Sequence, residues 1–229
     1  MDKVDINADL YEKVYDEIKD YGRAKYSHCP GIRLYPHYKD YLKGKIIDLG
    51  SGTGETVKFF RKKKFEAYGI DWIKPKNKFC KQGDITLKKD LRRYTVATSF
   101  DVMEHLNNSK VKGLFQNMIQ CKYQIFTISN DKSIISLKND TQIDLHINKK
   151  PFDVWRGIIS NYFQILRELP IRKSQRLYIC TNILETHEYN EYMAKFLRKQ
   201  GYEVNKMKHQ SMNEFLIQAF KKVQENEDS

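Results

Sequence analysis

Short apolar runs and helix-spaced apolar stripes alternate along this chain. Residues 55–64 and 109–120 place apolar side chains three or four positions apart, as amphipathic helices do. Serine 109 would cap the second of these helices. The alternation predicts a mostly parallel sheet joined by right-handed crossovers. Apolar runs that suit buried strands lie at 45–49, 66–72, 94–100 and 123–129, and residues 78–86 look like a short strand followed by GDI at 83–85.

The segments before the first strand have two different characters. Residues 5–20 carry Ile6, Leu10, Val14 and Ile18 at helical spacing. Residues 21–41 are instead rich in aromatic side chains, histidine and proline, which predicts a loop. Such a loop could cover a pocket, or it could be a strap packed on the sheet.

After residue 129 the pattern becomes less regular. Residues 130–151 are long for a connection, and long loops are often functional lids. A helix is expected over 152–162, followed by strands at 163–169 and 176–181 that a polar turn joins. Helical stripes return after residue 184. We therefore expect three parts: a helix and strap at 1–43, the main domain at 44–184, and a mainly helical extension at 185–229.

The stretch 45–54, KIIDLGSGTG, has the character of a ligand-binding turn. A buried strand ends at Asp48 and Leu49, and glycines then occupy every second position. Glycines let a backbone approach a ligand closely, and the N–H groups that open the following helix can face it. Nucleotide-type cofactors use this arrangement.

Two acidic residues follow at informative positions. Asp71 ends the second apolar run, near the spacing at which an acid reaches ribose hydroxyls in dinucleotide-binding folds. Asp84 is followed by Ile85, a pair that suits an adenine edge. The carboxylate would accept from the exocyclic amine while the isoleucine packs on the ring.

The charge and the cysteines of the chain indicate what kind of ligand and which cellular compartment to expect. The chain of 229 residues has 41 Lys and Arg against 29 Asp and Glu, a net charge of +12. Residues 58–93 hold 13 of the cations and only 4 acids, which suits a phosphate-binding stripe or a solvated face. The four cysteines are far apart and indicate a reducing compartment. With no apolar run long enough to span a bilayer, we expect a cytoplasmic protein.

The motifs together resemble the class I S-adenosylmethionine-dependent methyltransferases, over about residues 44–182. The resemblance rests on DLGSGTG at 48–54, the strand-ending Asp71, GDI at 83–85 and DVMEHL at 101–106. Residues 144–155 also look like the stretch after strand five in small-molecule and sugar or lipid members. Ser51 stands where many members have cysteine, and Trp72 follows the ribose-type acid. The family implies a Rossmann-like, seven-stranded sheet with a final antiparallel strand and helices on both faces.

The resemblance also implies S-adenosylmethionine as the cofactor and assigns residues to it. The glycines would approach the methionine part, Asp71 the ribose, and Asp84 with Ile85 the adenine. Residues 99–101 would line the sulfonium, whose positive charge Asp48 suits. The cofactor-binding set is Asp48, Gly50, Ser51, Gly52, Thr53, Gly54, Asp71, Trp72, Asp84, Ile85, Ser99, Phe100 and Asp101.

A base is needed only if the methyl acceptor is a hydroxyl or a charged amine. His146, His105 and Glu104 are the catalytic candidates, and His146 in the lid-like loop is the preferred one. Each has a structural alternative, such as a hydrogen bond from His105 to the backbone. The sequence shows no zinc motif, no phosphate-binding P-loop and no paired carboxylates, so we expect no metal.

The acceptor is less well defined. Residues 99–102 read SFDV where DNA amino-methyltransferases have an Asn or Asp, two prolines and an aromatic residue. The Pro-Cys nucleophile of cytosine C5 enzymes is missing, and so is a recognisable lysine–aspartate–lysine–glutamate set of 2′-O RNA enzymes. We therefore expect a small-molecule, sugar or nucleotide acceptor, and an anionic one would use the basic surface. The alternatives are a nucleic-acid-directed enzyme or binding module that uses residues 58–93, and a partner subunit without catalysis. Oligomeric state is left open.

Overall fold

The computed structural model describes residues 8–17, 29–75, 77–138 and 142–182. The chain divides into two compact units, residues 1–183 and 184–229. Only the first unit contains described residues. The predicted helical extension at 185–229 therefore lies outside them.

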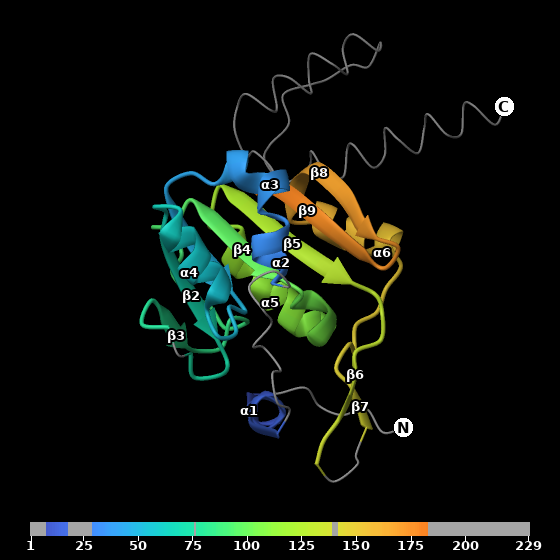
Figure 1. Ribbon diagram of the computed structural model, residues 1–229. Helices are drawn as coiled ribbons and strands as arrows, with labels where there is room; N and C mark the ends of the chain where they lie inside the picture. Colours follow the sequence, from blue (N-terminus) through green and yellow to red (C-terminus); the bar gives the residue numbers. More distant parts are fainter. Residues whose placement is uncertain (1–7, 18–28, 76, 139–141, 183–229) are drawn as a thin grey trace, which may run out of the picture. The chain divides into compact units, whose positions relative to one another are not determined.

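A seven-stranded sheet forms the centre of the first unit, in the order β3-β2-β1-β4-β5-β9-β8 (Figure 1). The first five strands pair in parallel, and β9 is antiparallel to both of its neighbours. This confirms the predicted Rossmann-like sheet. The strands are β1 (Lys45–Leu49), β2 (Glu66–Asp71), β3 (Cys80–Gln82), β4 (Val96–Phe100), β5 (Tyr123–Ser129), β8 (Phe163–Arg172) and β9 (Gln175–Asn182).

Helices cover both faces of this sheet because neighbouring strand residues point to opposite sides. Ile46 packs in one apolar core with Phe60 of α4, whereas Ile47 packs in the other with Phe115 of α5 and Trp155 of α6. The helical elements are α1 (Ala8–Glu17), α2 (Pro30–Arg33), α3 (Tyr35–Tyr38), the 3₁₀ turn η1 (Lys39–Tyr41), α4 (Glu55–Lys62), the 3₁₀ turn η2 (Met103–His105), α5 (Asn108–Met118) and α6 (Phe152–Ser160). Within the described ranges, no helix combines the length and the apolar character that crossing a bilayer requires.

The segment predicted as a loop at 21–41 is helical where it is described. From residue 30 onward it forms α2, α3 and η1. Leu34 and Tyr38 are buried in the core beside α4, and the Tyr38 hydroxyl donates a hydrogen bond to the Gly31 carbonyl. The prolines that suggested a loop occupy first-turn positions of α2 and α3, where a missing N–H costs nothing. This segment is part of the core.

The connection at 130–151 contains a two-stranded hairpin that the sequence did not predict. Its strands are β6 (Ile134–Ser136) and β7 (Gln142–Asp144), which pair antiparallel. Each strand has only three residues, too few to establish an alternating pattern. The hairpin gains its stability from a small apolar cluster in which Val14 of α1 meets Ile143 and Leu145.

Several element ends differ from the predicted ones. Asn107, not Ser109, caps α5, because its side chain accepts a hydrogen bond from the Lys110 N–H. The last two strands extend through the predicted turn to residues 172 and 175. Pro170 is tolerated there because β8 is an edge strand with an irregular register at that point.

Candidate functional site

The carboxyl ends of β1, β2 and β4 surround a cavity of about 150 Å³. The ends of neighbouring parallel strands are where α/β proteins bind ligands. Six of the predicted cofactor residues line it, together with one of the predicted catalytic histidines. The lining residues are Tyr11, Tyr15, Gly50, Asp71, Trp72, Ile85, Phe100, Asp101, Val102, His105 and Leu106.

The glycine turn after β1 is shaped by backbone that other residues adopt poorly. Gly50, Gly52 and Gly54 have φ angles of +81°, +53° and +86°. A Cβ at Gly50 would lie 2.4 Å from Val102 Cγ2, so this position also lacks space for a side chain. Asp71 holds the turn from the next strand, since its Oδ2 accepts a hydrogen bond of 2.7 Å from the Gly52 N–H. Burial raises the pKa of Asp71, and the hydrogen bonds from backbone N–H groups oppose this.

Asp48 is buried beneath this turn. Its Oδ1 accepts a hydrogen bond of 2.6 Å from Thr98 Oγ1 on the neighbouring strand. Burial raises the pKa of Asp48 to about 7, opposed by the Thr98 hydrogen bond and reinforced by the charge of Asp71. This carboxyl group therefore changes charge close to neutral pH.

Several predicted cofactor residues do not line the cavity. A Cβ built at Gly69 would lie 2.6 Å from Ser51 Oγ, which places the Ser51 side chain over β2. Ser99 Oγ is buried and donates to the Leu49 carbonyl. Thr53 lines a separate surface hollow beside α4. Asp84 accepts hydrogen bonds from the N–H and the hydroxyl of Thr86, which lower its pKa against the effect of burial.

Asp101 has an unusual backbone at the end of β4. Its φ angle is +54°, in the left-handed region that is uncommon outside glycine. Thr127 stabilises this conformation, because its Oγ1 accepts from the Asp101 N–H at 2.9 Å and donates to the Asp101 carboxylate at 2.6 Å. Gln175 at the start of β9 donates to the same carboxylate at 2.8 Å. Strained residues of this kind concentrate at functional sites.

The sequence did not identify Tyr11 and Tyr15, which come from α1 and form part of the cavity wall. The Tyr11 ring lies edge-to-face against Trp72, with ring centroids 6.0 Å apart, and against His105 at 5.8 Å. The available signal was their spacing of four positions on a predicted helix, beside the apolar stripe. Without the fold, nothing connected that helix to the glycine turn.

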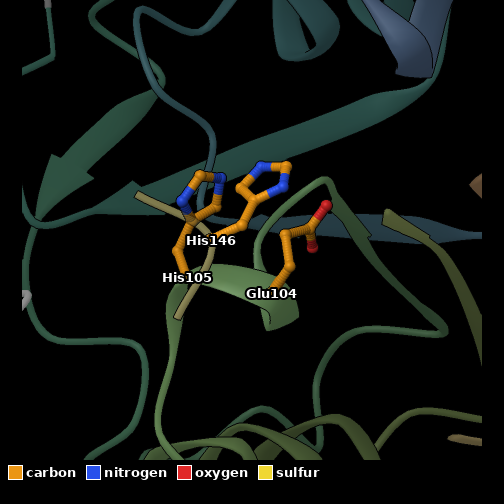
Figure 2. Close-up of side chains that lie close together, drawn as sticks. All are labelled: Glu104, His105 and His146. Carbon is orange, nitrogen blue, oxygen red and sulfur yellow. The ribbon is translucent and has the colours of Figure 1, made fainter. Parts of the chain in front are cut away.

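The three predicted catalytic residues come together beside the cavity. Glu104 and His105 lie on η2, directly after β4, and His146 follows β7 (Figure 2). The imidazole ring centroids are 4.6 Å apart. Each residue offers a nitrogen or oxygen atom to a group whose members all lie within 4.8 Å of one another, close enough to be considered for metal binding. Asn148 fixes the two segments, since its backbone N–H donates to the Glu104 carbonyl and its side chain donates to the Leu106 carbonyl.

Burial keeps this cluster poor in charge. It lowers the pKa of His105 to about 3, and the neighbouring His146 adds to the effect. The pKa of His146 is also lowered, again mainly by burial. Burial and the charge of Asp101 raise the pKa of Glu104 well above its ordinary value. Both imidazoles are therefore neutral at neutral pH and can offer nitrogen lone pairs.

The basic segment 58–93 surrounds a different hollow. A cavity of about 420 Å³ near the starts of β1 and β2 is lined by Lys78, Lys81, Lys89 and Arg93, among others. It is larger than the cavity at the strand ends but contains none of the predicted cofactor residues. Part of the positive charge is already engaged, since Arg61 stacks on the Phe79 ring at 3.4 Å.

Residues 25–123 match a family model described as a methyltransferase domain. This range contains the glycine turn, Asp71 and both Glu104 and His105. No curated protein sequence matches this chain significantly.

Solved structures share the fold at low sequence identity. The PH0226 protein of Pyrococcus horikoshii OT3 aligns with a TM-score of 0.55 and 13% identity, over 72% of this chain and 99% of that one. The methyltransferase domain of bacterial CtHen1 aligns with a TM-score of 0.53 and 17% identity, over 69% and 99%. A Burkholderia thailandensis 1,6-didemethyltoxoflavin-N1-methyltransferase, solved with its substrate and S-adenosylhomocysteine, aligns with a TM-score of 0.52 and 10% identity, over 76% and 86%.

Proposed function

We propose, from the premise that this chain carries a class I methyltransferase domain, that it transfers a methyl group from S-adenosylmethionine to a small-molecule acceptor. The domain match and the sheet order support the premise. The single observation that carries the proposal is the cavity at the strand ends, where Gly50, Asp71 and Asp101 meet. The Burkholderia thailandensis methyltransferase, which shares the fold, has 1,6-didemethyltoxoflavin and S-adenosylhomocysteine bound.

The residues present fit this donor. Gly50 presents backbone where a side chain has no room, so a ligand could approach the turn closely. Asp71 would accept hydrogen bonds from the ribose hydroxyls, and the buried Ile85 would pack on the adenine. The buried Asp48 lies below the turn and favours a positive charge nearby.

The cavity is small for such a ligand. Its 150 Å³ is below the roughly 300 Å³ at which ligand pockets usually begin. Tyr11 and Tyr15 form part of its wall, and Tyr15 lies close to Gly52. We expect a bound donor to displace these side chains of α1.

The chemistry asks mainly for alignment. When bound, the donor supplies an activated methyl group: a lone pair of the acceptor forms a bond to the methyl carbon, the carbon–sulfur bond breaks, and its electron pair returns to sulfur. The chain holds both reactants in line and excludes water. His105 lines the cavity, and the His146 ring packs against the His105 ring. These imidazoles are therefore placed to receive a hydrogen bond from an acceptor hydroxyl or amine.

Calorimetry with S-adenosylmethionine tests the proposal directly. We expect saturable binding with one donor per chain, as well as release of S-adenosylhomocysteine when the correct acceptor is added. Failure to bind the donor at millimolar concentration would overturn the enzyme function and favour a partner subunit without catalysis.

A nucleic-acid-directed function is the second candidate. Its support is the cavity whose wall combines Lys78, Lys81, Lys89 and Arg93 with Tyr68 and Tyr94. Cations bind phosphates, and aromatic rings stack on bases. Binding of RNA or DNA that weakens steeply with salt would support this candidate, and absence of retention on a nucleic-acid column would exclude it.

A further inference from the structure

Glu104 has a buried carboxylate oxygen with no partner. The residue is fully buried, and its Oε1 accepts a hydrogen bond of 2.9 Å from the Ser129 N–H. Its Oε2 is buried without a hydrogen-bond partner. A buried carboxylate oxygen without a partner destabilises the folded state, because it has lost its hydrogen bonds to water and no protein group replaces them. The Glu104 side chain belongs to the cluster with His105 and His146 (Figure 2).

Both imidazoles use Nδ1 for a hydrogen bond to a backbone carbonyl, which leaves Nε2 of each ring available as a ligand. His105 Nδ1 lies 3.0 Å from the Leu145 carbonyl oxygen, and His146 Nδ1 lies 2.6 Å from the Asp131 carbonyl oxygen. A carbonyl can only accept, so Nδ1 carries the proton in both rings. Each Nε2 therefore keeps its lone pair. Histidines that ligate metals are oriented in this way, with the second ring nitrogen donating to a carbonyl or carboxylate.

We propose that Glu104, His105 and His146 form a binding site for one divalent transition-metal ion. Two imidazole nitrogens and one carboxylate are a ligand set known for zinc and for ferrous iron, and they leave further coordination positions open. A magnesium site would instead be built mainly from oxygen atoms.

The geometry needs only small adjustments. Two ligands that are each about 2.1 Å from an ion lie at most about 4.2 Å apart. One ring nitrogen of each histidine and one Glu104 oxygen lie within 4.8 Å of one another, which exceeds that limit by only about 0.6 Å. The ion would satisfy the unpartnered Glu104 oxygen and offset its negative charge.

The position of the site indicates its use. His105 lines the cavity at the strand ends, so an open position on the ion can face that cavity. An oxygen of the acceptor bound there would lose its proton more easily, because a divalent cation stabilises the anion. This role points to a hydroxyl group as the methyl acceptor. It rests on the proposed methyl transfer, whereas the existence of the metal site is independent of that proposal.

The test uses the untagged full chain, treated with a chelator and titrated with Co²⁺ at neutral pH. Calorimetry and the visible absorption of bound Co²⁺ should both report one ion per chain. Substitutions Glu104→Gln, His105→Ala and His146→Ala should each weaken binding by about tenfold or more. The matched control is His37→Gln, since His37 is exposed on α3 and should leave the affinity unchanged.

Two further readouts keep the outcomes distinct. Glu104→Gln should leave the metal-free protein at least as stable to heating as the original chain, because the amide has no charge to bury and its oxygen can accept the same hydrogen bond from the Ser129 N–H. The variant should lose the stabilisation by Co²⁺. The proposed site would be overturned if Co²⁺ showed no saturable binding at millimolar concentration. It would also be overturned if all three variants bound Co²⁺ as tightly as the original chain does. Donor binding measured in the metal-free protein is a separate measurement, so loss of one activity leaves the other interpretable.

Discussion

The carboxylate of Asp71 accepts a hydrogen bond of 2.7 Å from the backbone N–H of Gly52. This bond joins the end of β2 to the turn that follows β1. Asp71 also accepts from the Ile73 N–H through its other oxygen. One side chain thus shapes the glycine turn, fixes the chain beyond β2 and lines the cavity beside them.

Replacing Asp71 with alanine should weaken binding of S-adenosylmethionine by about 10- to 100-fold. Hydrogen bonds that involve a charged group contribute roughly 1.5–3 kcal/mol, which corresponds to that range of affinity. Calorimetry would measure the affinity, and circular dichroism would check that the fold persists. Asp153→Ala is the control, because Asp153 is exposed on α6 far from the turn in sequence. Equal affinities for the Asp71 variant and the original chain would show that the ribose contact is placed wrongly.

A methyl group at Gly50 should destabilise the fold, whereas one at Gly157 should not. Gly50→Ala forces an L-residue to φ +81° and brings its Cβ to 2.4 Å from Val102. We expect a loss of about 1–3 kcal/mol in the free energy of unfolding. Gly157 lies inside α6 with nothing within 4 Å of an added Cβ. Gly157→Ala should therefore gain about 0.5–1 kcal/mol.

Urea unfolding of both glycine variants would measure these changes. The free energy of unfolding should fall in Gly50→Ala and rise in Gly157→Ala, although both substitutions add one methyl group. A general effect of added methyl groups would change both values in the same direction. Equal effects at the two sites would contradict the description of the turn.

Stability should depend on pH through Asp48. Its pKa is about 7 in the folded chain and about 3.9 in an unfolded one. Between these values the folded state holds a proton that the unfolded state has lost, so this group's contribution to stability falls as pH rises from about 4 to about 7. The Asp48→Asn side chain cannot ionise. The stability of this variant relative to the original chain should therefore increase by up to about 4 kcal/mol as the pH rises across that window. Urea titrations of both proteins at several pH values would measure the difference, and a constant difference would refute it.

Asn117 should be needed for the loop that carries Ile85. Its side chain donates to the carbonyls of Ile85 and Leu87, each at 2.8 Å, and accepts from the Lys89 N–H at 3.0 Å. Asn117→Ala leaves these three backbone groups without that partner and should cost about 2–4 kcal/mol. Gln116→Ala, on the exposed side of the same helix, should change stability by less than about 0.5 kcal/mol. Thermal unfolding of the two variants would compare them, and similar losses would argue against the role of Asn117.

The sheet was predictable because its pattern is local. The strands β1, β2, β4 and β5 each follow an apolar run of their own, whereas β3 has the sequence CKQ, and the helices α4 and α5 have clear apolar stripes. The hairpin β6–β7 was not predictable, because three-residue strands gain stability from contacts with Val14 and Leu145 that are distant in sequence. The same holds for residues 30–41, where Tyr35, Tyr38 and Tyr41 pack into the core although the local sequence resembles a loop.

The site was predictable in its residue types but less so in its geometry. The motif spacing placed Gly50, Asp71 and Ile85 at the strand ends, where they line the cavity. Side-chain direction was not accessible, so Ser51 and Ser99 were included although they face elsewhere. The cluster with His146 depends on a hairpin that brings a distant segment to η2, which no spacing rule describes.

If Asp101 serves the proposed methyl transfer, its left-handed backbone sets stability and activity against each other in any effort to engineer this protein. Glycine would relieve the strain at φ +54°, and it would also delete the carboxylate that Thr127 and Gln175 hold at the cavity. A library selected for heat resistance alone would be drawn to such a substitution. Selection for turnover in the same experiment is the safeguard, and the balance between the two would measure what this carboxylate contributes.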